Sequence, residues 1–500
     1  MFQVNNTEKF YNSTALCKNS KNSINFNNKV FDVGFVVSVS DEIVNCTGLK
    51  SIKLGEIIFC KKKVGSQLIK FQGLVVNIAF NIASCIFFAN TQAIGPGTKI
   101  LSTGSPLFVL VSSSSLGQLV DCLGYRFLSG TIPATSLYHK VERPAPGITY
   151  RQSIGEPLHT GNILVDGSFP IGRGQRELIL GDRQTGKTTV AINAIRIQMF
   201  DSILQFFKRT IYCIYVAVGQ KKSNLAKLFS FLKKEGCMSY TIIVATSSSD
   251  PASLQFLAPY TGCSIAEYFR DRGQDTLVIY DDLSKQAVAY RQITLLLRRP
   301  PGREAYPGDI FYLHARLLER AAKMSNLYGG GSLTALPVVE TLVGDITSYI
   351  PTNVISITDG QIFLDNQIFN KYYKPAINIE LSVSRVGSNA QLRFYRKVSN
   401  LFKRDLLKYI KLIDQNTNAS DALAETRNLL DLGTRMFLII SHKNPLCVEL
   451  QFFLSFLSIT GFLNKFILSE ITSFLEALVF RSNLMFFLKI NFFKAVNFTF

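Results

Sequence analysis

Short apolar runs separated by glycine and polar residues dominate residues 29–103. Residues 33–37, 55–59 and 74–76 are rich in Val, Ile and Phe, which favours strands. Residues 71–98 carry no formal charge and approach the length of a membrane-spanning helix. Asn, Ser, Gln, Gly and Pro interrupt that stretch, so we expect buried strands there. The pattern predicts a polar N-terminal arm at residues 1–28 and a small β-barrel at residues 29–103.

From residue 104 to residue 391, apolar runs alternate with helical patterns, which is typical of a parallel α/β sheet. The strands that we expect all end at polar or glycine residues, and ligands of such sheets bind at the carboxyl ends of the strands. They comprise residues 211–218, 240–245, 276–280 and 332–340.

Residues 392–500 follow a helical pattern and predict an α-helical C-terminal domain. The last fifty residues hold 13 of the 39 phenylalanines and only six charged residues. A helix of this composition is buried on most faces or docks on partners.

Charge and cysteine content narrow the class of protein. Lysine and arginine total 54 against 35 acidic residues, a net charge of +19 that suits nucleic acid, an anionic membrane surface or acidic partner subunits. The nine cysteines include no C-x-x-C pair, which argues against a zinc site and against a secreted disulfide framework. The first arginine is Arg126, and residues 1–30 lack the pattern of a transit peptide. If the protein works in an organelle, we expect it to be made there.

A phosphate-loop motif lies in the centre of the chain. An apolar run at residues 178–180 precedes it, and a helical pattern at residues 189–195 follows. Glycines allow the backbone N–H groups to surround phosphate oxygens, a lysine reaches the β- and γ-phosphates, and a hydroxyl ligates Mg²⁺. The motif predicts nucleoside triphosphate binding by Gly181, Asp182, Arg183, Gln184, Thr185, Gly186, Lys187 and Thr188.

Two strand ends supply further candidates. Asp281 directly follows the strand at residues 276–280, as expected of the carboxylate that holds Mg²⁺, whereas Asp282 suits a helix N-cap. Gln220 ends a neighbouring strand, where a hydrolysing ATPase needs a base or a water-positioning group. An amide cannot readily accept a proton, which favours binding without turnover. A glutamine that merely caps a loop is an equally good interpretation of this residue alone.

Five segments together resemble the alpha subunits of F-type rotary ATP synthases. The resemblance is close over residues 144–391, thinner in the barrel, where residues 116–124 match best, and poor beyond residue 432. Residues 212–220 and the connection at residues 196–209 resemble the mitochondrial type. The five segments are residues 170–178, 181–188, 280–287, 297–309 and 375–388.

This resemblance implies a RecA-like P-loop nucleotide-binding domain at residues 104–391 and an alternating hexamer with ATP synthase beta subunits. It also implies a central-stalk gamma subunit, and a peripheral-stalk subunit at the N-terminal arm. The alpha site is expected to hold ATP or ADP with Mg²⁺ without turnover, so the chain is not expected to be catalytic alone. As part of the complex it is expected to contribute to proton-driven ATP synthesis. The expected location is the matrix side of the mitochondrial inner membrane. The chain is expected to bind no nucleic acid and to contact the membrane only through the complex.

Residue roles follow from the same resemblance. Arg385 matches the arginine that alpha extends to the neighbouring beta site, an arginine finger that meets phosphoryl oxygens with a planar fork. Ser382 and Ser384 are assigned to the same catalytic site. The further nucleotide-binding assignments are Thr189, Gln220, Glu340, Lys374 and Pro375, with Thr188 and Asp281 on the metal.

Departures from the family pattern concern the adenine and the C-terminus. Lys374 stands where the family has arginine, and a lysine stacks less well. The family's later K-Q-G-Q contacts align with residues 441–444, Ser-His-Lys-Asn, so neither glutamine is kept. The phenylalanine-rich C-terminus replaces a charged helical bundle, so its packing against partners must differ.

Two rival functions share the same fold. A hexameric RNA-translocating helicase would use the positive charge on phosphates, but it predicts a catalytic acid in place of Gln220 and a recognisable RNA-binding barrel. The catalytic beta subunit is the second rival, and Gln220 argues against it as well.

Overall fold

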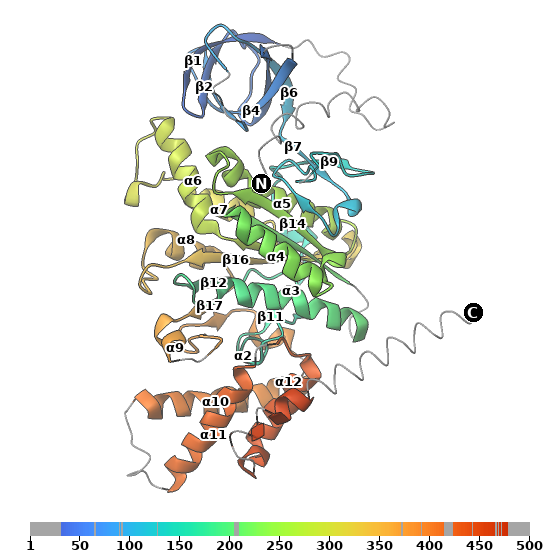
Figure 1. Ribbon diagram of the computed structural model, residues 1–500, viewed down its shortest axis with the longest axis vertical. Coiled ribbons are helices and arrows are strands. Elements are labelled where there is room, and N and C mark those ends of the chain that lie inside the picture. The colour runs from blue at the N-terminus through green and yellow to red at the C-terminus, as the bar shows by residue number, and fades with distance from the viewer. Residues whose placement is uncertain are drawn as a thin grey trace, which may run out of the picture. The chain divides into compact units, whose positions relative to one another are not determined.

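The computed structural model describes most of the 500-residue chain and divides it into two compact units (Figure 1). The first unit comprises Met1–Gly147, Tyr212–Arg272 and Thr276–Arg320, and the second comprises Ile148–Ile211, Gly273–Asp275 and Ala321–Phe500. The described residues are 32–478, with the exception of residues 65–66, 90, 92–93, 128, 205–209, 372–373, 392, 415–423, 443, 466–467, 469 and 472. The predicted arm at residues 1–28 lies outside them.

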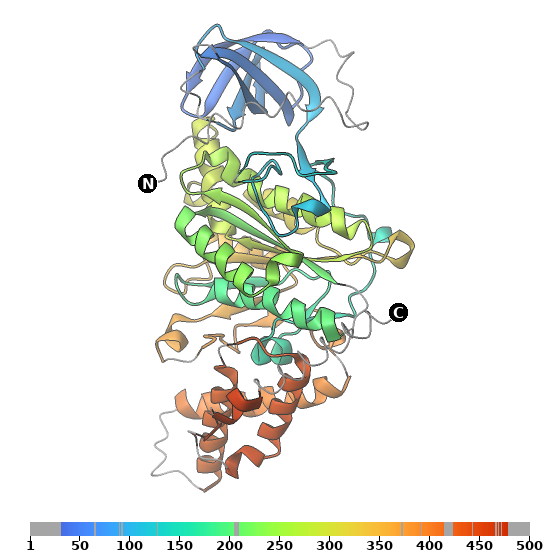
Figure 2. The ribbon, with the colours of Figure 1, turned by 45° about the vertical axis from the view of Figure 1, so that its right-hand side comes forward.

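A closed β-barrel forms the beginning of the first unit (Figure 2). Its six strands follow the order β1-β2-β5-β4-β3-β6, and each strand is antiparallel to both of its neighbours. The barrel confirms the strand pattern that the sequence predicts. The strands are β1 (Val33–Ser40), β2 (Ile43–Thr47), β3 (Glu56–Val64), β4 (Gln67–Ala79), β5 (Ile82–Phe87) and β6 (Lys99–Pro106).

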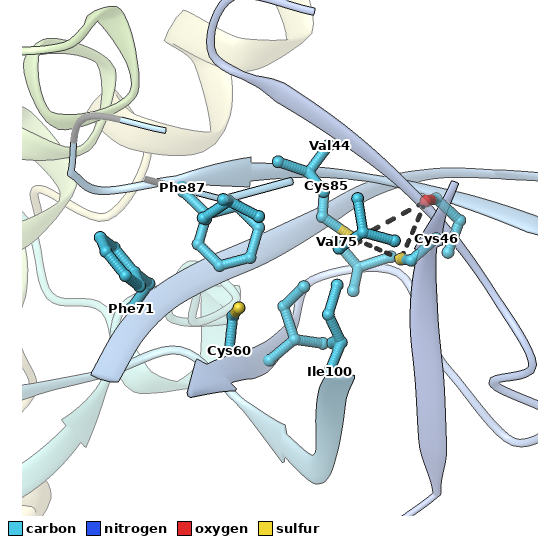
Figure 3. Close-up of a cluster of buried hydrophobic side chains, with 12 residues drawn as sticks. Val44, Cys46, Cys60, Phe71, Val75, Cys85, Phe87 and Ile100 are labelled. Atoms are coloured by element: carbon cyan, nitrogen blue, oxygen red, sulfur yellow. Dashed lines mark hydrogen bonds between the residues drawn. The ribbon is translucent and has the colours of Figure 1, made fainter. Parts of the chain in front are cut away.

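Side chains that alternate along these strands fill the barrel. Cys46, Cys60 and Cys85 are fully buried among aliphatic and aromatic residues. Figure 3 shows Cys60 near Phe71 and Phe87, and Cys46 next to Cys85. The uncharged stretch at residues 71–98 therefore supplies strands β4 and β5 to this core, as expected. Over the described residues, no helix has the length and apolar character needed to cross a bilayer.

A small parallel sheet and its helices make up the rest of the first unit. Its strands follow the order β15-β13-β14-β8, and β13 pairs in parallel with β14, which pairs in parallel with β8. Helix α5 packs against β14 and α6, and β7 and β9 form a separate two-stranded antiparallel sheet. The elements are β7 (Phe108–Val111), β8 (Leu119–Val120), β9 (Leu137–Lys140), β13 (Ile211–Gln220), α4 (Lys222–Lys234), β14 (Thr241–Ser247), α5 (Ala252–Arg270), β15 (Asp275–Asp281), α6 (Leu283–Leu296) and α7 (Ile310–Leu318).

The second unit has its own strands and covering helices. Strand β12 lies between β16 and β17 and is parallel to both, and β18 is antiparallel to β17. Helices α3 and α8 each pack against β12 and β16. The elements are β10 (Pro157–Leu158), α2 (Ile163–Ser168), β11 (Ile171–Gly172), β12 (Leu178–Gly181), α3 (Lys187–Leu204), β16 (Ser332–Glu340), α8 (Tyr349–Ile357), β17 (Gly360–Leu364), α9 (Asn366–Asn370) and β18 (Val383–Ser384). The observed strands β13, β14, β15 and β16 confirm the four strands that the sequence predicts.

Helices complete the second unit, as the sequence predicts. They are α10 (Arg393–Asp414), α11 (Ala424–Ile440) and α12 (Val448–Ile459), and α10 packs against α2 as well as against α11 and α12. A Cβ on Gly433 would overlap the ring of Tyr409, so this close approach of α10 and α11 depends on the glycine. Helix α12 buries Leu454 but exposes Phe453 and Phe456, and residues 479–500 lie outside the described residues.

Candidate nucleotide-binding site

The phosphate-loop motif occupies the turn between β12, which ends at Gly181, and α3, which begins at Lys187. A Cβ on Gly181 would lie 2.7 Å from the Leu364 carbonyl oxygen and 2.8 Å from Thr185 Oγ1, so only glycine fits there. Gly186 has a φ of 98°, and a Cβ built on it would meet no atom within 4 Å. The open space beside Gly186 lets a phosphate group approach the loop backbone.

The ammonium of Lys187 lies within the loop. It donates to the carbonyl oxygen of Gly181 at 2.7 Å and also to that of Asp182. Thr185 Oγ1 donates to the same Asp182 carbonyl at 2.8 Å, which closes the turn. The N-terminus of α3, which has 18 residues, adds its partial positive charge, so the loop attracts anions.

Strand β16 ends beside the loop, because Glu340 pairs with Gly181 in the sheet register. Asp182 Oδ1 accepts hydrogen bonds from Thr341 Oγ1 at 2.7 Å and from the Gly344 N–H at 2.8 Å. Asp182 therefore anchors the loop to the turn after β16. Arg183, 82 % exposed, forms a salt bridge with Glu340 through Nε and Oε1, which places both residues at the rim of the loop.

Asp281 and Gln220 lie together in the first unit, whereas the loop belongs to the second. Asp281 is buried at the end of β15, and its Oδ2 accepts a hydrogen bond from Gln220 Nε2 at 2.9 Å. The hydroxyl of Tyr215 donates to the same oxygen. Burial and the Asp281 charge raise the pKa of Tyr215 well above its usual value, so this phenol remains a donor.

Asp282 has the structural role that the sequence predicts. Its Oδ1 accepts from the Lys285 N–H at 2.7 Å and caps the N-terminus of α6. The peptide bond between Asp281 and Asp282 is cis. Tyr215 was not identified from the sequence. Strand β13 contains two tyrosines, Tyr212 and Tyr215, and the sequence gives no sign of which one reaches Asp281.

The two predicted catalytic serines hold the backbone around β18. Buried Ser382 accepts from the Phe363 N–H at 3.0 Å and donates to the Asn378 carbonyl at 2.5 Å. Ser384 Oγ donates to the Pro170 carbonyl at 2.8 Å and accepts from Gln175 Nε2 at 3.1 Å. Both hydroxyls therefore fix the shape of the segment that leads to Arg385.

Arg385 directly follows β18 and is exposed. Its backbone N–H donates to the Asp359 carbonyl at 2.8 Å, which fixes the main chain. Within the described part of the chain, no hydrogen bond or salt bridge holds its guanidinium. The second unit thus presents a permanently charged planar fork on a fixed backbone.

The residues assigned to adenine recognition have local partners. The Lys374–Pro375 peptide bond is cis, and the exposed Lys374 ammonium lies 4.8 Å from the ring centroid of Phe369. His442 and Asn444 line a cavity of about 20 Å³ together with Gly161, Asn162, Ile163, Asn193, Ile439, Ile440 and Leu446. That volume suits a single water molecule. Lys443 lies outside the described residues.

The candidate residues contain suitable ligands for a nucleotide and a magnesium ion. Mg²⁺ prefers oxygen donors, and the Thr188 hydroxyl of the second unit and the Asp281 carboxylate of the first unit are each donors of this kind. The open backbone at Gly186 and the Lys187 ammonium suit the phosphates. The fold and these residues define a P-loop nucleotide-binding protein with an N-terminal barrel and a helical C-terminal region.

Comparisons with known proteins specify the family. Residues 161–384 match the nucleotide-binding domain of the ATP synthase alpha/beta family. The ATP synthase subunit alpha of Ehrlichia ruminantium (strain Gardel) is 46 % identical over 458 residues, which cover 91 % of this chain and 89 % of the relative. The same subunit of Ehrlichia canis (strain Jake) is 46 % identical over 459 residues, with the same coverage of both chains. This chain belongs to the ATP synthase alpha-subunit family, which does not favour the RNA translocase alternative.

Proposed function

We propose that this chain holds Mg-ATP or Mg-ADP at its own phosphate loop without hydrolysing it. The observation that carries this proposal is the contact between Gln220 and Asp281, in which the amide donates to the carboxylate at 2.9 Å. An amide engaged in this way has neither the basicity nor the freedom to activate a water molecule. The strand end at Gln220 is therefore suited to binding rather than to chemistry.

The chain's own residues would bind the nucleotide in separate roles. Lys187 and the loop N–H groups would hold the phosphates, and Thr188 and Asp281 would hold Mg²⁺, which neutralises phosphate charge when bound. Glu340 lies at the rim through its salt bridge with Arg183. Lys374 and Pro375 would lie near the base. Thr189, the third residue of α3, adds a hydroxyl behind the loop.

We further propose that Arg385 serves the catalytic site of a neighbouring beta subunit. Its guanidinium is exposed while its backbone is held by Asp359, and a permanently charged fork stabilises the charge of a transferring phosphoryl group. Ser382 and Ser384 support this role through the backbone of β18. The reaction would be proton-driven ATP synthesis by the assembled complex.

The proposed surroundings follow from the family. They are an alternating hexamer with beta subunits, a central-stalk gamma subunit and a peripheral-stalk subunit at residues 1–28. The proposed location is the matrix side of the mitochondrial inner membrane, and the relatives named above are bacterial. The predicted domain limits at residues 103 and 391 also stay proposals.

A reconstituted complex with beta and gamma subunits tests this function. Mass analysis should count three copies of this chain and three of beta, and each copy of this chain should retain nucleotide through repeated turnover. Exchange of the nucleotide on this chain at the rate of turnover would contradict the non-catalytic role.

A further inference from the structure

A buried glutamate that the proposed function does not use lies at the start of β12. Glu177 is fully buried, and its Oε2 accepts a hydrogen bond from Gln175 Nε2 at 2.7 Å. Its other oxygen, Oε1, has no hydrogen-bond partner. Buried polar atoms without partners are uncommon and costly, so this carboxyl needs a specific explanation.

The Glu177 carboxyl lies against the strand pair that carries Arg385. A Cβ on Gly360 of β17 would overlap both Glu177 Oε2 and the Val383 carbonyl oxygen of β18, so no side chain separates the carboxyl from β18. Gln175 connects the same groups, because its Nε2 also donates to Ser384 Oγ at 3.1 Å. The carboxyl is therefore coupled directly to the backbone on which Arg385 stands.

Two charged side chains, Asp359 and Arg385, act on this carboxyl. Asp359 precedes β17 and accepts hydrogen bonds from Arg176, at 2.9 Å from Nε, at 2.7 Å from Nη2 and at 3.1 Å from the backbone N–H. Burial first, and then the Asp359 charge, raise the pKa of Glu177 well above its usual range, whereas Arg385 acts in the opposite direction. Gly360, which lies against the carboxyl, pairs with Ser384 in the sheet register, so Arg385 is the next residue along the chain from this pair.

We propose that Glu177 is a positioning residue for Arg385, whose guanidinium can turn either outward to a phosphoryl group or back toward the Glu177 carboxyl. When the carboxyl is protonated, it holds the guanidinium weakly and the side chain is free to reach outward. When the carboxyl loses its proton to solvent, the resulting carboxylate attracts the guanidinium inward. This inference rests on the proposed role of Arg385 and adds a control of it by proton concentration.

The direction of the effect follows from these charges. As pH rises, Glu177 ionises and withdraws Arg385, so turnover by the assembled complex should fall on the alkaline side. The amide in Glu177→Gln cannot ionise, so this part of the alkaline fall should vanish. In Asp359→Asn the repulsive charge is lost and the pKa of Glu177 decreases, so the fall should begin at lower pH.

The experiment measures ATP turnover by the reconstituted complex from pH 6 to pH 9, an interval of about three units around the ordinary working pH of enzymes. The measured quantity is turnover at the alkaline end divided by turnover at neutral pH. We expect Glu177→Gln to raise this ratio by up to about fivefold, because one partly exposed ion pair changes an equilibrium by about that factor. The matched control is Glu380→Gln, an exposed glutamate of the same unit, which should leave the ratio unchanged.

The outcomes separate this inference from the function on which it rests. A wild-type pH profile in Glu177→Gln would overturn the positioning role even if Arg385→Lys abolishes turnover. If Arg385→Lys has no effect, the finger role itself fails. If Glu177→Gln does not assemble into the complex, Asp359→Asn provides the test. An alkaline fall in turnover that begins at the wild-type pH or at a higher pH in this variant would overturn the inference.

Discussion

The phosphate loop and the Arg385 segment each present a cation, but the chain holds the two cations differently. Lys187 is half-buried and bonded to the carbonyl oxygens of Gly181 and Asp182 within its own loop. Arg385 is exposed, and its backbone N–H is held by the Asp359 carbonyl oxygen. One cation is thus held by carbonyl oxygens of its own loop, whereas the side chain of the other is exposed.

The supporting contacts differ in the same way. Thr185 and Asp182 close the loop over a few residues. The Arg385 segment depends on Gln175 and Pro170, more than two hundred residues away in sequence. The loop therefore holds its lysine with its own backbone, although Asp182 also bonds the turn after β16, whereas the backbone before Arg385 is held by residues distant in sequence.

Arg385→Lys should produce the largest effect. Lysine keeps the charge but loses the planar fork, and arginine fingers contribute roughly 10³–10⁵ in rate, so turnover by the reconstituted complex should fall by about three orders of magnitude. Nucleotide binding to this chain's own loop should remain. Steady-state turnover measures the effect, with Arg396→Lys on an exposed position of α10 as the control. Near-normal turnover would refute the finger.

Lys187→Ala should have the complementary effect. Removal of a charged donor to phosphate should weaken ATP binding by the isolated chain about 10- to 100-fold. Equilibrium dialysis measures the dissociation constant. The matched control is Lys222→Ala, since Lys222 also opens a helix, α4, and is exposed. Equal loss of affinity in both variants would show only a general effect of charge.

Gly360→Ala should disturb the Arg385 segment alone. The new methyl would overlap the Glu177 carboxyl and the Val383 carbonyl, and overpacking of this kind costs about 1–3 kcal/mol of unfolding free energy. Turnover should fall while nucleotide affinity stays. Urea denaturation and binding are measured together, with Gly155→Ala as the control, because a Cβ there meets nothing within 4 Å.

Glu177→Gln tests the electrostatics through stability. Because the pKa of Glu177 is raised in the folded state, the wild-type contribution of this group is fully present at low pH. This stabilising contribution is lost as the pH rises above the pKa that Glu177 has in the unfolded chain. Glutamine has no such dependence, so the stability of the variant relative to wild type should increase with pH. Denaturation of the full chain at several pH values measures this, and a constant difference would contradict the shift.

Lys374→Arg should have the smallest effect. Arginine stacks on an aromatic face better than lysine does, and such contacts contribute up to about 1 kcal/mol at exposed sites, which is about fivefold in affinity. We expect tighter ATP binding by at most this factor, measured by titration of the isolated chain. Lys371→Arg, also exposed, is the control. Weaker binding in Lys374→Arg would argue against a place near the base.

The sequence was informative where function depends on consecutive residues. The loop motif, its strand and its helix are contiguous, so their order could be predicted and was confirmed at β12 and α3. Asp281 and Gln220 could be proposed because strand ends of a parallel sheet meet at one edge. Their direct contact required the structure, since 61 positions separate them.

Features that depend on packing could not be predicted. The Tyr215 hydroxyl reaches Asp281 across 66 positions, and nothing in the apolar strand β13 indicates which side chain turns toward the acid. The contact of the Glu177 carboxyl with β17 and β18 exists only in the folded chain, so the sequence does not reveal it. The assigned serines are a further example, because Ser382 and Ser384 prove to be bonded to the backbone.

The fate of one bound nucleotide shows whether the site on this chain hydrolyses ATP. The full-length chain is loaded with radiolabelled ATP and Mg²⁺, freed of excess nucleotide, and followed for release of labelled phosphate over many turnover times of the assembled complex. We expect the label to remain on the chain as ATP, because Gln220 provides no base. Sustained phosphate release that Lys187→Ala abolishes would contradict it.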